Sequence, residues 1–345
     1  MIAILVAVAL VWGGGALAGV PRANRVAMLG GVLVALFALA VILPETHPFR
    51  PYLGGARDWI QVGVLALAVA AYVWGFRKVK ARAQGPVTAP PEAKGDDTLE
   101  RYARHIVLRE IGGAGQARLG RGRVLVVGAG GLGAPVLLYL GAAGVGTLGV
   151  IDDDTVAVSN LQRQVIFDMG QVGQPKVFAV ADRLAALNPG VAVRPYNRRF
   201  TDEIGAELVA DYDLVIDGTD DPETRAAVNR ACVARGVPLL SGAIAQWEGQ
   251  VSLFDPRRGA PCYACLFPDP EAARLGPTCA EGGVAGPLPG VIGTMLALEA
   301  VKELAGAGQG LRGRLLIWDG LWGESRTIEI GRRDGCAVCG DIAPA

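Results

Sequence analysis

The sequence is poor in histidine and has no excess of basic residues, and each shortage argues against a class of function. Only His47 and His105 occur among its 345 residues. Because histidine is a common general base and metal ligand, we expect neither a Ser–His triad nor a metal site built on histidine. Nine basic and five acidic residues precede residue 98, which leaves 24 basic against 28 acidic residues, a net charge of −4, in the remainder. This balance is not typical of a nucleic-acid-binding protein.

Charge is absent from three long apolar runs near the start of the chain, residues 2–20, 26–43 and 60–76. Each approaches the roughly 20 apolar residues that cross a bilayer as one helix. We therefore expect a membrane anchor with three transmembrane helices over residues 1–76. Two alternatives stay open: the first run contains Ala16-Leu17-Ala18, which resembles the cleavage site of a signal peptide, and the shorter runs also suit buried core helices.

The charges beside these runs predict how such an anchor is oriented. Arg22 and Arg25 follow the first run, and a basic cluster from Arg77 to Arg82 follows the third. Because basic residues collect on the cytoplasmic side of membrane proteins, we expect a multi-pass membrane protein whose catalytic domain faces the cytoplasm. Residues 77–97 become rich in Pro, Ala and polar residues and are expected to form a linker.

A glycine-rich turn dominates the segment RVLVVGAGGLGAPVLLYL, which begins at Arg123. The first residues predict a buried strand and the last a helix, and between them lies a G-x-G-x-x-G turn formed by Gly128, Gly130 and Gly133. Glycine lets the backbone approach a ligand closely, and the unpaired N–H groups of a helix start favour phosphate. About 20 residues later Asp152 ends a second strand, where such folds have a ribose-binding carboxylate. These features predict a nucleotide or dinucleotide site, and at this point an NAD-dependent dehydrogenase fits them equally well.

The remaining pattern alternates between strands and helices. Such alternation predicts an α/β fold with a Rossmann-like, mostly parallel sheet that carries antiparallel additions. The expected helices are 98–112, ended by Gly112-Gly113, then 134–143, 174–187, 222–235 and 291–306. The expected strands are 124–127, the run ending at Asp152, 191–196, the run ending at Asp217, 237–240, 250–254, 311–320 and 325–330.

Many short motifs then occur in one order: GAGGLG, SNLQRQ, VGQPK, TDD, SGA, EGQ, PCYAC, TCAEGGV and GCAVC. Together they resemble the ThiF/MoeB/HesA family, which includes the molybdopterin-synthase adenylyltransferase and is related to the ubiquitin-activating enzymes. The resemblance covers about 245 residues and defines a ThiF-type domain over 98–345. It implies that the C-terminal glycine carboxylate of a ubiquitin-like sulfur carrier attacks the α-phosphate of ATP, which yields an acyl-adenylate and pyrophosphate.

The resemblance favours the molybdopterin synthase small subunit, a carrier that ends in Gly-Gly, as the substrate. The thiamine-pathway sulfur carrier is a second substrate hypothesis within the same class. From other classes, an NAD-binding oxidoreductase and a non-catalytic nucleotide-sensing membrane protein remain as alternatives. The pairing of SNLQRQ with VGQPK argues against these last two.

The resemblance also assigns roles to single residues. For each charged residue the alternative interpretation is an ordinary solvated charge on the surface. Gly131 and the three motif glycines approach the phosphates, and Asp152 holds the ribose. Lys176 neutralises the triphosphate, and the nucleotide is lined by Ser159, Asn160, Leu161, Gln162 and Arg163. Asp220 associates with Mg²⁺. The family usually has asparagine where Asp221 stands, and either aspartate also suits the cap of a helix that starts at Pro222.

The cysteines divide into three kinds. Two C-x-x-C pairs suit a closed tetrahedral Zn²⁺ site, with reduced, unliganded thiols as the alternative; they are Cys262 and Cys265, then Cys336 and Cys339. Cys232 lies in a helical pattern and is expected in the core. Cys279 lies in a long Gly- and Pro-rich loop, and the resemblance makes it a candidate for a catalytic cysteine, although adenylation does not need one.

The resemblance finally implies a symmetric homodimer. The arginine of its R-Y-x-R segment, here Arg104, would reach the triphosphate held by the partner chain. A solvated helix face is the alternative for this residue. The predicted cofactors are thus ATP, Mg²⁺ and a structural Zn²⁺.

Overall fold

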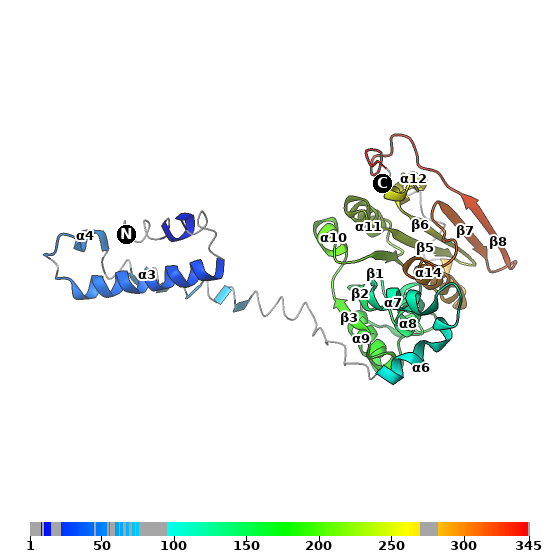
Figure 1. Ribbon diagram of the computed structural model, residues 1–345, viewed down its shortest axis with the longest axis horizontal. Coiled ribbons are helices and arrows are strands. Elements are labelled where there is room, and N and C mark those ends of the chain that lie inside the picture. The colour runs from blue at the N-terminus through cyan, green and yellow to red at the C-terminus, as the bar shows by residue number, and fades with distance from the viewer. Residues whose placement is uncertain are drawn as a thin grey trace. The chain divides into compact units, whose positions relative to one another are not determined.

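The fold is that of a computed structural model, shown in Figure 1. The described residues are 8, 10–14, 22–44, 46–53, 55, short pieces of 59–75, 95–269 and 282–343. The chain divides into two compact units, Met1–Lys80 and Ala81–Ala345, and each is treated by itself. Most of the predicted linker and all of the loop around Cys279 lie outside the described residues.

The first unit corrects the expectation of a membrane anchor. Its described elements are the π-helix η1 (Leu10–Gly14), α3 (Arg22–Ile42) and the short α4 (Arg50–Leu53). Across the described part of the chain, no helix combines the length and the apolar character that crossing a bilayer demands. The prediction of three transmembrane helices, and of a multi-pass membrane protein with a cytoplasmic catalytic domain, is therefore wrong.

The reason lies in the difference between an apolar run and a continuous helix. Among the described residues of this unit the longest helix is α3, whose first turn carries Arg22 and Arg25, so that its uncharged part, 26–42, is only at the short end of the lengths that cross a bilayer. Much of the other two runs, 2–20 and 60–76, lies outside the described residues. Composition alone therefore overstated this part of the prediction.

The second unit is built on a sheet of eight strands in the order β3-β2-β1-β4-β5-β6-β7-β8. The pairs from β3 through β5 are parallel, and those from β5 through β8 are antiparallel. This is the Rossmann-like sheet with antiparallel additions that the alternating pattern predicts. The strands are β1 Arg123–Val127, β2 Thr147–Ile151, β3 Ala192–Tyr196, β4 Leu214–Asp217, β5 Leu239–Ala245, β6 Glu248–Phe254, β7 Arg314–Asp319 and β8 Glu324–Glu329.

Helices cover both faces of this sheet, as Figure 1 shows. They are α6 Gly95–Ile106, α7 Gly112–Arg121, α8 Gly133–Ala143, α9 Lys176–Leu187, α10 Asp202–Val209, α11 Pro222–Arg235, α12 Tyr263–Leu266 and α14 Pro287–Ala305. Alternate residues of β1 enter different cores, because successive strand side chains point to opposite faces. Val126 packs in one core with α8, α9 and α14, whereas Leu125 packs in the other with α10 and α11.

Three of these helices, α7, α10 and α12, were not expected from the sequence. The expected helix 98–112 is wrong at its end: α6 already stops at Ile106, and Gly112, whose φ is +57°, begins α7 instead of ending a helix. Gly115 of α7 lies against Ala305, where a Cβ would come within 3.5 Å of the alanine. The helix is thus supported by packing on α14 rather than by its glycine-rich sequence. The short α10 was also missed.

The turn between β1 and α8 owes its shape to two glycines. Gly128 has a φ of +90°, in the left-handed region that favours glycine. A Cβ on Gly133 would lie 1.9 Å from the carbonyl oxygen of Gly128, which no side chain permits. The start of α8 therefore packs directly against Gly128, the residue that follows β1.

We expect Gly133→Ala to destabilise the protein by more than about 2 kcal/mol, because the backbone must move apart to admit the methyl group. Gly130→Ala is the matched control, since the nearest atom to its Cβ, Nε2 of Gln164, is 3.7 Å away. Urea unfolding of both variants measures the difference. Equal stabilities would show that the close contact does not constrain this turn.

Candidate functional site

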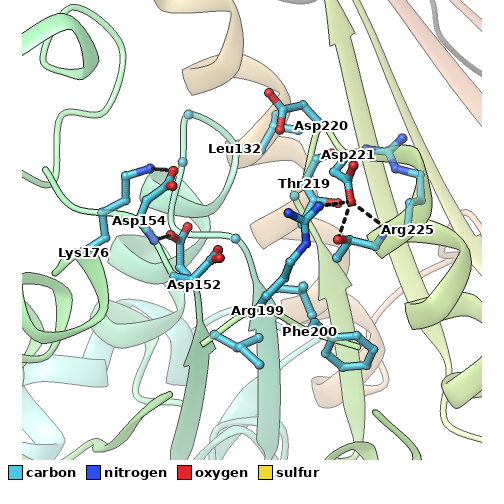
Figure 2. Close-up of a pocket in the computed structure, with 18 of the residues that line it drawn as sticks. Leu132, Asp152, Asp154, Lys176, Arg199, Phe200, Thr219, Asp220, Asp221 and Arg225 are labelled. Atoms are coloured by element: carbon cyan, nitrogen blue, oxygen red, sulfur yellow. Dashed lines mark hydrogen bonds and ion pairs between the residues drawn. The ribbon is translucent and has the colours of Figure 1, made fainter. Parts of the chain in front are cut away.

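A cavity of about 370 Å³ opens at the carboxyl ends of β1, β2 and β4. It lies where the strand order reverses between β1 and β4, which is the place where open α/β sheets bind ligands. Figure 2 shows the side chains that enter it. The glycine turn forms one wall through Gly128, Gly130 and Gly131.

Asp152 lies at the end of β2, facing the glycine turn. Its Oδ2 accepts a hydrogen bond from the backbone N–H of Ala129 at 2.7 Å, and its Oδ1 accepts one from Asp154 at 2.8 Å. Burial raises the pKa of Asp152 above its ordinary value, while the nearby Lys176 and these two hydrogen bonds act in the opposite direction. The carboxylate is therefore fixed against the turn before any ligand arrives.

Lys176 stands at the first residue of α9, with a side chain that is only 5% exposed. Its Nζ forms an ion pair with Oδ2 of Asp154 at 2.7 Å. Arg163 lines the same side, and its Nη1 donates to the backbone oxygen of Ser159 at 3.1 Å. Two cations thus face the phosphate side of the turn, and such groups suit binding of phosphate oxygens.

The loop after β4 carries the two aspartates expected there, and they differ in surroundings. Asp220 is exposed and lines the cavity, and no hydrogen bond or ion pair to another described residue holds its carboxylate. Asp221 is the N-cap of α11, because its Oδ2 accepts from the backbone N–H of Thr224 at 2.9 Å. Arg199 also pairs with this oxygen at 2.6 Å, as Figure 2 shows.

Beneath this loop lies a buried ion pair that the sequence analysis missed. Nε of Arg225 is 3.1 Å from Oδ2 of Asp217, and their side chains are 9% and 0% exposed. Burial lowers the pKa of Arg225, but the charges of Asp217 and Asp220 and the interaction with Tyr263 together outweigh burial, so the pKa is raised. Two local signals existed, since Asp217 interrupts an otherwise apolar strand end and Arg225 follows in the next helix. Their partnership could not be read from spacing alone.

The structure brings together nine of the expected nucleotide residues around one cavity: Gly128, Gly130, Gly131, Asp152, Asn160, Arg163, Lys176, Asp220 and Asp221. Gly133 lies under the turn. Four others do not line the cavity, namely Ser159, Leu161, Gln162 and Arg104, and Leu161 packs against the apolar core instead. Arg198, Arg199, Phe200 and Tyr263 line it without having been expected.

The four expected zinc ligands form a separate cluster. Sγ of Cys262 is 3.8 Å from that of Cys265 and 3.7 Å from that of Cys336, and Cys265 and Cys339 are 3.4 Å apart. Tetrahedral Zn²⁺ with bonds of about 2.3 Å separates its sulfur ligands by about 3.8 Å. All four sulfurs lie within 4.8 Å of one another, so the donor set fits zinc. Cys232 is buried apart from them, in the core, as expected.

The cavity and sheet define a nucleotide-binding α/β domain, and comparison with known proteins identifies it further. The ThiF family model matches residues 102–338. The chain is 48% identical to a sulfur carrier protein adenylyltransferase of Thermus thermophilus over 249 residues, which cover 71% of this chain and 92% of that protein. The chain therefore belongs to the ThiF family, and it is an adenylyltransferase. The NAD-binding oxidoreductase alternative is thereby set aside.

Two further comparisons agree with this assignment. Over 245 residues the chain is 45% identical to the adenylyltransferase and sulfurtransferase MOCS3 of Dictyostelium discoideum, with 70% of this chain but only 57% of that protein covered. A crystal structure of E. coli MccB with ATP aligns with a TM-score of 0.61 at 21% identity, covering 74% of this chain and 77% of that one. The second comparison establishes the fold alone.

Asp221 contributes to stability in two ways, as the N-cap of α11 and through its charge beside Arg199, and the two contributions can be tested separately. Burial raises its pKa, but hydrogen bonds from Thr224 and the ion pair with Arg199 outweigh burial, so the pKa is lowered. A lowered pKa means that the charge contributes stability at neutral pH, and that this contribution is lost as the pH falls through the folded-state value.

We expect Asp221→Ala to cost about 1 kcal/mol at neutral pH, because the helix cap is lost. Asp221→Asn keeps the cap and should cost less than about 1 kcal/mol, since the pair with Arg199 is partly exposed. Urea unfolding from about pH 7 down to about pH 3 should show the deficit of Asp221→Asn shrinking once the pH falls below the ordinary aspartate pKa. A deficit that is constant with pH would mean that the charge contributes nothing.

Proposed function

We propose that this adenylyltransferase activates the C-terminal glycine of a ubiquitin-like sulfur carrier with ATP. The observation that carries the proposal is that Asp152, Arg163, Lys176 and Asp220 face one cavity beside a glycine turn. The name of the Thermus thermophilus relative, a sulfur carrier protein adenylyltransferase, supports the choice of substrate class. Within that class we propose the molybdopterin synthase small subunit, and the thiamine-pathway carrier is the second candidate.

The reaction needs positioning and neutralisation of charge more than a covalent nucleophile. Asp152 would hold the ribose hydroxyls, and the N–H groups of the glycine turn would approach the phosphates. Arg163 and Lys176 would neutralise the charge that develops as pyrophosphate leaves the α-phosphate. Lys176 would exchange its Asp154 partner for phosphate oxygen.

Asp220 is the residue that would hold Mg²⁺. Its carboxylate is exposed and lines the cavity, so it offers a hard oxygen ligand with room for water. Bound Mg²⁺ would supply additional neutralisation of phosphate charge. Asp221 already serves the helix cap and the pair with Arg199, which makes it the weaker candidate.

Pyrophosphate exchange into ATP tests this function. The protein should exchange labelled pyrophosphate only when a carrier that ends in Gly-Gly is present, and more rapidly with the molybdopterin synthase subunit than with the thiamine carrier. Asp220→Asn should reduce exchange about 100-fold or more because phosphate charge is left uncompensated. Cys279→Ser should leave exchange intact, because adenylation does not need a cysteine. Exchange with neither carrier would refute the proposal.

The cysteine cluster is proposed to hold one structural Zn²⁺ away from the reacting atoms. Four sulfur ligands close the coordination sphere, so no position is left for substrate. We expect about one zinc per chain in purified protein and a marked loss in Cys262→Ser, whereas Cys279→Ser should keep its metal. Elemental analysis measures both variants, and undiminished zinc in Cys262→Ser would exclude the site.

Arg104 is proposed to act on the nucleotide of a partner chain in a homodimer. Its side chain is exposed and does not line the cavity of its own chain. Its helix is held in place by Asn188, whose Nδ2 donates to the hydroxyl of Tyr102 at 2.8 Å. The arginine is thus presented outward from a docked helix, where a second chain could use it.

Mixing two inactive homodimers tests this arrangement. Arg104→Ala and Asp220→Ala should each be nearly inactive, because each removes one component from every site. When they are unfolded and refolded together, half of the dimers should be mixed and roughly a quarter of the sites restored. Pyrophosphate exchange at the parental level, despite mixed dimers that are detected directly, would contradict the shared site.

A further inference from the structure

At the floor of the cavity the guanidinium of Arg225 binds three groups, all of which belong to the protein itself. Its Nε pairs with Asp217 at 3.1 Å, and its Nη2 donates to the backbone oxygens of Gly242, at 2.9 Å, and Thr219. One guanidinium therefore connects the end of β4, the middle of β5 and the loop that leads to α11. The planar, multiply donating guanidinium suits such a three-way contact, and an ammonium group does not.

Thr219 is held from two sides. While Arg225 donates to its carbonyl oxygen, Oδ1 of Asp217 accepts from its backbone N–H at 3.0 Å and from its hydroxyl at 2.8 Å. The other carboxylate oxygen of Asp217 accepts from Ser241 at 2.8 Å. The residue directly before Asp220 consequently has fixed backbone and side-chain positions.

Asp220 itself lacks such support. No described residue holds its carboxylate through a hydrogen bond or an ion pair, so its direction depends on the backbone on either side. On the far side the cap residue Asp221 is bound to Thr224 and Arg199. Both neighbours of the exposed carboxylate are therefore fixed, one through the buried pair and one through the cap.

Stability alone is a poor explanation for the buried pair. Taking two charges out of water costs free energy that their attraction often does not recover, and apolar replacements of similar volume are frequently as stable. The ring of Tyr263 lies 5.7 Å from the guanidinium and lines the cavity as well. Arg225 itself lines the cavity, so the pair forms part of its wall, where its geometry affects the site.

We propose that Arg225 is a positioning residue for adenylation: together with Asp217 it clamps Thr219 and so aims the Asp220 carboxylate into the nucleotide cavity. The proposal rests on the adenylation function proposed above. Arg225 acts through the loop and does not contact the reacting atoms. The nucleoside end of the cavity, at Asp152, is independent of the clamp.

Arg225→Lys tests the clamp because it keeps the positive charge and removes the fork. The maximal rate of pyrophosphate exchange should fall about 10- to 100-fold, the range expected when a reacting group is misplaced. The dissociation constant of AMP, which has no β- or γ-phosphate, should stay within about twofold of wild type. Arg230→Lys is the matched control, since Arg230 lies on the same helix and pairs at the surface with Asp202 at 2.6 Å.

Thr219→Val provides a second test in case Arg225→Lys does not fold. It removes only the hydroxyl that Asp217 accepts from and should lower exchange several-fold with AMP binding unchanged. The proposal is overturned if Arg225→Lys catalyses exchange as fast as Arg230→Lys, or if Thr219→Val is as active as wild type. It is also overturned if exchange, AMP binding and thermal stability all fall together in Arg225→Lys. A wild-type protein without exchange would instead refute the adenylation function itself.

Discussion

A contact that only glycine permits joins the ends of β1 and β4 to the start of α8. The Cα of Gly133 lies so close to the carbonyl of Gly128 that a Cβ would come within 1.9 Å of it. Gly218 closes the other side, because its N–H donates to Val127 at 3.0 Å and a Cβ on it would come within 3.2 Å of the N–H nitrogen of Gly133. The helix start is thereby held at the sheet edge, where its N–H groups and the loop after β4 border the same cavity.

Several charged side chains around this cavity already form ion pairs, and in these pairs a nucleotide phosphate could take the place of the aspartate. Lys176 rests against Asp154 and Arg199 against Asp221, whereas Arg163 is bonded to a backbone oxygen of Ser159. A triphosphate would meet these cations and the exposed carboxylate of Asp220 within one cavity. Arg225, which lines the cavity, forms a buried pair with Asp217 and fixes the geometry of this part of the wall.

Local patterns predicted the parts of the fold that depend on local chemistry. The strand before the glycine turn, the position of Asp152 and the helix from Pro222 to Arg235 followed from apolar runs, glycine spacing and a proline at a helix start. Resemblance to the family supplied Lys176 and Asp220, which do line the cavity.

Features that depend on distant partners were not predictable in the same way. α7 is supported by its packing on α14, and Arg199 and Arg225 gain their importance only from aspartates that folding brings to them. The three membrane helices were inferred from apolar composition, which does not ensure one continuous apolar helix. Ser159, Leu161 and Gln162 came from a motif of which only Asn160, Arg163 and Gln164 line the cavity.

The central claim is that this one cavity binds ATP through both its ribose and its phosphate sides. Calorimetric titration of ATP into the wild-type protein, Asp152→Asn and Lys176→Met measures it most directly. The account predicts one ATP per chain in the wild type, binding at least about tenfold weaker in each variant, and no competition by NAD. Equal ATP affinity in all three proteins would contradict it, because the nucleotide would then bind elsewhere.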